Sequence, residues 1–301
     1  MHYKKPILIA EVGCNHKGKI DIAKKFIHIA SNFCGIRFIK FQKRDPKTLL
    51  SDEEYNSPHP VPENSYGHTY GEHREFLEFD ITQHKKLMNE CKKRKMEYSS
   101  SVWDLKSAKE ITKLNPSYIK VGSATNLDFE VLNYLCKKYK GKIHLSLGMT
   151  SKKEEKKIVN FFTKKNRSMD LILYACTSAY PVESKDVCLL EIDRLVKVYK
   201  EKKKVFDIGF SGHHKGIAFD TAAYALGANY IERHFTLDRT WKGTDHAASL
   251  EPDGMRRLCR NLAELHLALK FKSNDILKVE KNSRKKLKKK FCRYEKIICN
   301  C

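Results

Sequence analysis

Hydrophobic residues gather in short, nearly continuous runs that recur along most of the chain and are rich in β-branched side chains. Strands buried on both faces have this pattern, because both sides of the backbone pack against apolar neighbours. The runs are short enough for strands, and most are separated by longer segments of a different pattern. We therefore predict strands over eight ranges: Ile7–Gly13, Ile36–Gln42, Glu97–Val102, Tyr118–Ser123, Lys142–Gly148, Leu171–Thr177, Asp207–Gly212 and Tyr230–Thr236.

The intervening segments repeat apolar residues at helical spacing, as Leu87 and Cys91 do. Asp104 and Ser151 stand where helix N-caps would fall. Strands and helices that alternate in this order predict a (β/α)8 TIM barrel of the α/β class. An open doubly wound sheet is the alternative, and the absence of a Gly-x-Gly-x-x-Gly turn after the first strand disfavours it.

Two regions depart from the alternation. Residues 43–80 form a long connection that holds several prolines and a Tyr/His/Gly cluster around Tyr66 to His73. A connection this long in a compact domain is usually a functional lid or a disordered segment. Beyond about residue 270 the pattern predicts one helix and a charged terminus. We expect one barrel domain over residues 1–270 and a short basic tail over 271–301.

The net charge is +23, from 59 basic and 36 acidic residues. A charge of this size steers anionic substrates or holds nucleic acid. Most lysines are spread along the chain without interleaved aromatic residues, as on solvated helix faces, so we expect no nucleic-acid partner. The exception is the basic run Arg284–Lys290, which leaves nucleic-acid binding through residues 279–301 as a minor hypothesis.

No apolar run approaches the length needed to span a bilayer, and residues 1–6 do not resemble a secretory signal. The ten cysteines form no Cys-x-x-Cys pair, so we expect reduced thiols. Cys299 and Cys301 are a weak candidate for binding a soft metal. These features predict a soluble, cytoplasmic protein without a membrane partner.

Lysines stand inside two of the predicted strands, Lys40 in Phe-Ile-Lys-Phe and Lys120 in Tyr-Ile-Lys-Val. A buried, unpaired ammonium group is costly, so each must meet an acid or an anionic ligand. A salt bridge to Glu11 or Glu232 is the structural alternative to ligand binding. Barrel active sites form at the carboxyl ends of the strands, where these residues would lie.

His213 and His234 stand at the ends of two consecutive predicted strands. Neutral imidazole is the commonest metal ligand in proteins, and adjacent parallel strands bring their ends close together. We predict that the pair shares a divalent metal with positions left open for substrate. A buried structural role is the alternative for either one, and His214 and His246 are expected to be loop residues.

Further polar side chains are expected at the same mouth, with Asn15 and His16 just beyond the first strand. Serines at strand ends are more often turn formers, but here they converge with the two lysines. Lysines with hydroxyl donors suit a small anion that carries phosphate and carboxylate. Two histidines on one metal suit polarisation of a carbonyl oxygen. The residues thus indicate a metal-assisted carbon–carbon bond-forming or lyase reaction.

The same residues lie in motifs that resemble the N-acetylneuraminate (sialic acid) synthase family. The matching stretches include Ile9–Gly18, Thr69–Arg74, Cys176–Pro181, Phe210–His213 and Glu232–Asp238, and they extend from about residue 7 to residue 265. Their forms look most like the animal-type members, which act on N-acetylmannosamine 6-phosphate. Bacterial members use the unphosphorylated sugar or related precursors.

The resemblance implies condensation of phosphoenolpyruvate with an N-acetylmannosamine-type aldehyde, with release of phosphate. It implies Mn²⁺ or Mg²⁺ held by His213 and His234. The candidate catalytic residues are Lys40, Lys120, Glu11 and Asp245, and the candidate substrate-binding residues are Gln42, Ser101, Ser123, Ser146, Tyr180, Ser211 and Glu232.

Full-length members of the family continue into an antifreeze-like domain that contributes to the partner's site in a swapped dimer. At 301 residues the chain is expected to lack that domain, although a homodimer stays possible. One alternative is therefore a barrel that binds phosphoenolpyruvate without turnover. Another is a synthase of the legionaminate or pseudaminate type.

Overall fold

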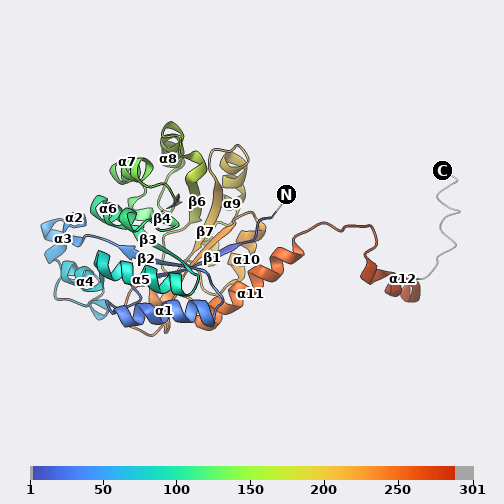
Figure 1. The fold of residues 1–301 in the computed structure, drawn as a ribbon, viewed down its shortest axis with the longest axis horizontal. Coiled ribbons are helices and arrows are strands. Elements are labelled where there is room, and N and C mark those ends of the chain that lie inside the picture. Colours follow the sequence, from blue (N-terminus) through green and yellow to red (C-terminus); the bar gives the residue numbers. More distant parts are fainter. Residues whose placement is uncertain (1–2, 289–301) are drawn as a thin grey trace. The chain divides into compact units, whose positions relative to one another are not determined.

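The computed structural model describes residues 3–288. Its strands close into one barrel in sequence order, and every neighbouring pair is parallel (Figure 1). The predicted (β/α)8 barrel is confirmed. The strands are β1 (Ile7–Gly13), β2 (Phe38–Lys43), β3 (Glu97–Val102), β4 (Tyr118–Val121), β5 (Lys142–Ser146), β6 (Leu171–Cys176), β7 (Asp207–Gly212) and β8 (Tyr230–His234).

The predicted strand bounds are right for β1, β3 and β7. Strand β2 begins two residues later and ends one residue later than predicted. Strands β4, β5, β6 and β8 end one or two residues before the predicted positions, because the residues that follow turn over the barrel mouth. At β4, for example, Ser123 begins a 3-10 turn, Ser123–Thr125. These early ends place hydroxyl groups beside the cavity instead of within the sheet.

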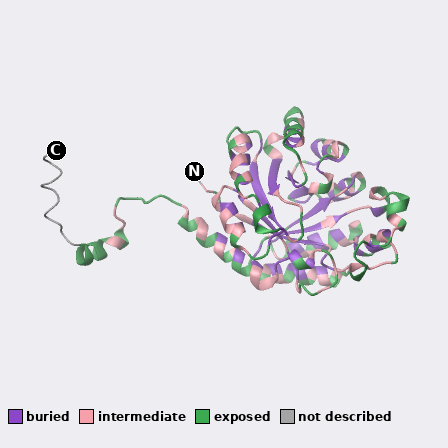
Figure 2. Ribbon diagram, turned by 180° about the vertical axis from the view of Figure 1, so that it is seen from behind, coloured by how far each residue is buried: buried purple, intermediate pink, exposed green. Residues whose placement is uncertain are grey.

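Helices surround the barrel, with buried strands inside and exposed outer helix faces (Figure 2). Asp104 accepts a hydrogen bond from the Ser107 N–H at 2.7 Å, and Ser151 forms a capping box with Glu154, so both predicted N-caps are confirmed. The barrel helices are α1 (Ile20–Asn32), α5 (Ile81–Lys93), α6 (Leu105–Leu114), α7 (Phe129–Lys138), α8 (Lys152–Lys164), α9 (Leu190–Leu195), α10 (Ala218–Ala225) and α11 (Pro252–Ala268).

A buried arginine on β8 contacts polar residues that follow β7. Arg233 on β8 is fully buried, and its Nη1 lies 2.5 Å from Asp220 and 2.9 Å from His214 Nε2. His246 is also buried and lies 2.7 Å from the Thr236 hydroxyl. Both histidines follow their strands, as expected, but they are held inside the protein and not at the surface.

The connection at residues 43–80 is ordered, so the disordered alternative is wrong. It contains α2 (Pro46–Leu49), α3 (Asp52–Asn56) and α4 (Tyr70–Leu77), together with a 3-10 turn at Pro62–Asn64. Capping boxes begin α3 at Ser51 and α4 at Thr69. A Cβ atom on Gly71 would lie 2.2 Å from the Tyr55 ring, so only glycine allows α4 to pack this closely against α3.

The chain divides into two compact units, Met1–His266 and Leu267–Cys301. The described part of the second unit contains a 3-10 turn, Lys278–Glu280, and α12 (Lys281–Leu287), and Lys272 Nζ lies 3.0 Å from Glu280. The remaining basic residues of the predicted tail, with Cys299 and Cys301, lie outside the described residues. Among residues 3–288, no helix is both long and apolar enough to cross a membrane.

Candidate active site

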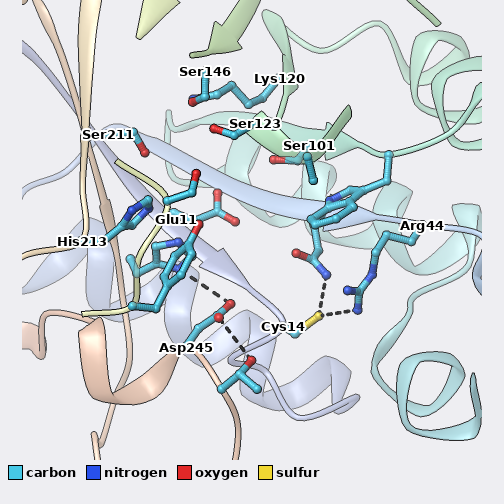
Figure 3. A pocket seen from close by; sticks show the side chains of 18 of the residues that line it. Glu11, Cys14, Arg44, Ser101, Lys120, Ser123, Ser146, Ser211, His213 and Asp245 are labelled. Atoms are coloured by element: carbon cyan, nitrogen blue, oxygen red, sulfur yellow. Dashed lines mark hydrogen bonds and ion pairs between the residues drawn. The ribbon is translucent and has the colours of Figure 1, made fainter. Parts of the chain in front are cut away.

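A cavity of about 350 Å³ opens at the carboxyl ends of the strands (Figure 3). Every side chain that the sequence singled out for catalysis, substrate or metal lines it. These are Glu11, Lys40, Gln42, Ser101, Lys120, Ser123, Ser146, Tyr180, Ser211, His213, Glu232, His234 and Asp245. Asn15 and His16 do not line it: Asn15 donates to the Phe235 carbonyl at 2.9 Å, and His16 stacks on Phe79.

The register of the sheet explains why these residues meet. Glu11 is paired across the ladder with Lys40 on one side and with His234 on the other. Ser101 is likewise paired with Lys120. In a closed barrel, residues at the same height on neighbouring strands form a layer, so pairing alone gathers these side chains.

The two buried lysines are paired with the two buried acids. Lys40 forms an ion pair with Glu11, and its Nζ donates to Ser101 Oγ at 2.6 Å. Lys120 Nζ lies 3.1 and 3.0 Å from the two carboxylate oxygens of Glu232. We call Glu11, Lys40, Lys120 and Glu232 the floor quartet. The salt-bridge alternative is therefore present for both lysines, at the surface of the cavity.

The two acids of the quartet have opposite pKa shifts. Burial raises the pKa of Glu11 to about 8, helped by the neighbouring Glu232, although Lys40 opposes the shift. Burial alone would raise the pKa of Glu232, but Lys120 and Lys40 hold it at about 2. Near neutral pH Glu232 is then the one ionised carboxylate of the quartet, while burial lowers the pKa of Lys120. An anion bound beside Lys120 would favour the charged form of this lysine.

Three serines share the part of the cavity wall where Lys120 lies. Figure 3 shows Ser146 of β5 and Ser211 of β7 there, together with Ser123 of the turn after β4. Ser211 Oγ donates to Glu232 at 3.2 Å, which fixes its position beside the ion pair. Asn126 holds the end of β5 by donating to the Ser146 carbonyl at 2.8 Å. Hydroxyl donors on one wall with an ammonium group suit phosphate oxygens.

The two histidines lie together, with ring centroids 5.4 Å apart. His213 Nδ1 donates to the Thr177 carbonyl at 2.9 Å, which leaves the lone pair on Nε2. Ligating histidines commonly make such a hydrogen bond with the nitrogen that does not bind the metal. Burial, with His234 nearby, lowers the pKa of His213 to about 3, so the ring is neutral.

His213 and His234 fit a metal ion that takes few of its ligands from the protein. His234 Nδ1 is buried, has no hydrogen-bond partner and lies 3.9 Å from Asp245 Oδ2. Within residues 3–288, no group of three or more His, Cys, Asp or Glu side chains is arranged to hold a metal ion. His213 and His234 can therefore supply two ligands, which leaves the other positions to water or substrate.

Several lining residues were not named from the sequence. They include cationic and aromatic side chains of the connection after β2, for which the signals were the Tyr/His/Gly cluster and the family-like stretch Thr69–Arg74: Arg44, His59, Tyr70, His73 and Arg74. Arg44 Nε lies 2.5 Å from Glu78. With its amide oxygen turned toward Arg44, Gln42 accepts from Nη2 at 3.0 Å and from Nε at 3.1 Å. Arg44 Nε and Nη2 are thus engaged by protein groups.

Fold and site together define a (β/α)8 barrel whose cavity joins two buried lysine–acid pairs to a pair of neighbouring histidines. The chain matches the model of the NeuB family over residues 26–274 and belongs to that family.

Its similarity to characterised relatives covers most of the chain. The mouse and human N-acetylneuraminate-9-phosphate synthases are each 36% identical over 282 residues, which cover 94% of this chain and 76% of each enzyme. The N,N'-diacetyllegionaminic acid synthase of Campylobacter jejuni is 33% identical and covers 94% of this chain and 82% of its own. The solved N-acetylneuraminic acid synthetase of Leptospira borgpetersenii aligns with a TM-score of 0.79 at 25% identity, over 95% of this chain and 94% of that one.

Proposed function

We propose that this protein condenses phosphoenolpyruvate with N-acetylmannosamine or its 6-phosphate to a sialic-acid-type nonulosonate and releases phosphate. The observation that carries the proposal is one cavity that joins the floor quartet to His213 and His234. Relatives named as synthases of sialic and legionaminic acids support the reaction type. The enzyme is then a transferase of carbohydrate biosynthesis.

Phosphoenolpyruvate occupies the floor in this proposal. Lys120 and the surrounding serines bind the phosphate, and Lys40 with Ser101 binds the carboxylate. Both lysines are held by buried acids, so they reach the ligand without reorganisation. Glu11, which is protonated near neutral pH, is a buried proton donor beside Lys40.

His213 and His234 hold the divalent metal, Mn²⁺ or Mg²⁺, which when bound supplies Lewis-acid polarisation of the sugar aldehyde. Tyr180 packs against His213 with ring centroids 4.1 Å apart, and this limits rotation of the imidazole. Gln42 and Asp245 line the same part of the cavity and orient the sugar hydroxyls and a water molecule.

The bonds balance without a further reactant. The enol carbon of phosphoenolpyruvate attacks the aldehyde carbon, and a carbon–carbon bond forms while the aldehyde oxygen takes a proton from a carboxylic acid of the cavity and becomes a hydroxyl group. Water adds to the cationic carbon that results, and the proton it loses passes to a cavity carboxylate. The phosphate then leaves by carbon–oxygen cleavage. One water is consumed for each phosphate released.

The test is turnover by the purified full chain with phosphoenolpyruvate, Mn²⁺ or Mg²⁺, and either N-acetylmannosamine or its 6-phosphate. Phosphate release and a product of the mass of the nonulosonate are expected, and both should stop when a chelator is added. Absence of product with either sugar would overturn the proposal. Binding of phosphoenolpyruvate without product would instead support the barrel that has lost turnover.

A cytoplasmic location and a homodimer belong to the same proposal. The location is supported by the cysteines within residues 3–288, which are all free thiols, as in a reducing compartment. The homodimer rests on the family resemblance, and measurement of the molar mass in solution tests it.

A further inference from the structure

We propose that His59, Tyr70, His73 and Arg74 form a second anion subsite, which binds the phosphoryl group of a phosphorylated sugar. We call these residues the rim cluster. All four line the cavity, and all come from the connection between β2 and α5. The inference rests on the proposed function and names the feature that selects the sugar.

Backbone hydrogen bonds fix both histidines of the rim cluster as donors. His59 Nδ1 accepts from the Val61 N–H at 3.0 Å, and His73 Nδ1 accepts from the Tyr66 N–H at 3.1 Å. A neutral imidazole that accepts at Nδ1 carries its proton on Nε2. Both side chains are more than nine-tenths buried, and within residues 3–288 neither Nε2 makes a hydrogen bond. The protein therefore holds two N–H donors at the cavity wall without an acceptor.

Arg74 adds a positive charge to these donors. Its Nη2 donates to the Tyr70 hydroxyl at 2.7 Å, and its guanidinium lies over the Tyr70 ring, 4.6 Å from the centroid. Tyr70 accepts that bond, so its own O–H stays free to donate. Arg74 Nε is buried without a partner, and within the described residues Arg74 makes no ion pair. A guanidinium in this state suits the oxygens of a phosphate.

The electrostatic surroundings of the cluster are positive. Burial lowers the pKa of His73 to about 4, and the nearby positive charges of Arg44, Arg74 and Lys242 lower it further. The cavity acids belong to the floor quartet or, in the case of Asp245, lie beside His234. Glu78 is engaged by Arg44. Glu54 lies close enough to interact electrostatically with Arg74 but forms no ion pair with it among the described residues. An anion at the rim cluster would therefore meet cations on a wall that no cavity-lining carboxylate shares.

The rim cluster belongs to the wall of the cavity toward which the phosphate of a bound sugar would point. In open-chain N-acetylmannosamine 6-phosphate the aldehyde and the phosphate lie at opposite ends. Figure 3 shows His213 and Arg44 on opposite sides of the cavity, and Arg44 belongs to the same connection as the rim cluster. An aldehyde held near His213 would direct its phosphate toward that far side.

The experiment measures kcat/KM for the sugar 6-phosphate and for the unphosphorylated sugar in the full chain and in two variants. Wild type is expected to prefer the phosphorylated sugar. Arg74→Gln should lower kcat/KM for that sugar about 10- to 100-fold, mainly through KM, because a charge-assisted bond is lost. Tyr70→Phe, which keeps the ring, should lower it about 3- to 10-fold.

The controls concern the rest of the reaction. In both variants kcat/KM for the unphosphorylated sugar and KM for phosphoenolpyruvate should stay within about twofold of the wild-type values. Arg257→Gln on the exposed face of α11 is the matched control for the loss of an arginine.

Calorimetric binding of each sugar, with phosphoenolpyruvate and a chelator present, separates this inference from the proposed function. Failure of turnover with both sugars would overturn the proposed function, while a binding preference for the 6-phosphate that Arg74→Gln or Tyr70→Phe removes would still support the subsite. If wild type binds both sugars equally, or if both folded variants keep the wild-type preference, the subsite is wrong. Tyr70→Phe decides the matter if Arg74→Gln does not fold.

Discussion

The floor quartet and the rim cluster line one cavity but carry their charges in different ways. The floor lies on strands and is almost fully buried, and each of its lysines is paired with an acid of the protein, Lys40 with Glu11 and Lys120 with the ionised Glu232. The rim lies on a connection and presents N–H groups that protein acceptors do not use. A buried ammonium group needs a polar partner even in the absence of ligand, whereas a neutral imidazole N–H at a cavity wall costs less when it has no partner. We expect changes to the floor to alter stability and catalysis together, and changes to the rim to alter substrate choice alone.

The largest effect should come from breaking one ion pair of the floor. Lys120→Met leaves Glu232 buried without its nearest partner, which costs about 3–5 kcal/mol in the free energy of unfolding. The same change removes the ammonium group from the phosphate site, so kcat/KM for phosphoenolpyruvate should fall about 1000-fold. Chemical denaturation and steady-state kinetics measure the two effects.

A double variant separates stability from catalysis at the floor. Lys120→Met with Glu232→Gln removes both charges, so most of the lost stability should return while kcat/KM stays low. Arg74→Gln serves as the rim control and should change the free energy of unfolding by less than about 1 kcal/mol. If Arg74→Gln lowered the free energy of unfolding as much as Lys120→Met does, the expectation that the rim affects substrate choice alone would be wrong.

The next effect concerns the histidine pair above the floor. His213→Ala removes a neutral imidazole whose orientation Thr177 fixes, so Mn²⁺ affinity and metal-dependent kcat should each fall about 100-fold or more. Electron paramagnetic resonance of Mn²⁺ titrations measures the first, and turnover with and without chelator measures the second.

His84→Gln is the matched control for this change, because His84 is buried outside the cavity and bonds to Tyr98. It should lower stability and leave Mn²⁺ binding unchanged. Unaltered Mn²⁺ affinity in His213→Ala would remove His213 from the metal site.

The sequence predicted the floor better than the rim for a physical reason. A lysine within a buried apolar strand must meet an acid or an anionic ligand. The apolar residues beside Lys40 and Lys120 in the sequence were therefore enough to predict a site. Alternation of strands and helices then placed both at one mouth. Which acid pairs with which lysine depends on sheet register, and the sequence left both Glu11 and Glu232 open.

The rim depended on contacts between segments far apart in the chain, which no local pattern encodes. The connection is packed by Gly71 against Tyr55, and the Tyr66 hydroxyl donates to the Lys242 carbonyl at 2.6 Å. The orientation of His73 depends in turn on the backbone of Tyr66. The tyrosines and histidines near residue 70 indicated a functional loop. Which nitrogen of His73 faces the cavity follows only from the folded connection.

The smallest effect tests whether Glu11 of the floor quartet is protonated in the folded protein. The pKa of Glu11 is raised to about 8 in the folded protein, against about 4.5 as its ordinary value. The folded state then binds the extra proton between these limits, so the stability that Glu11 contributes is full below pH 4.5 and is lost as pH rises toward 8. Relative to Glu11→Gln, wild type should lose unfolding free energy as the pH rises across this window, because the folded protein releases its extra proton there. Urea denaturation at pH 5, 6, 7 and 8 measures the difference. Tyr70→Phe is the rim control, and its unfolding free energy should change with pH as that of wild type does.

If the unfolding free energies of wild type and Glu11→Gln changed in parallel with pH, Glu11 would be ionised in the folded protein. The floor would then have no unbalanced positive charge with which to bind phosphoenolpyruvate.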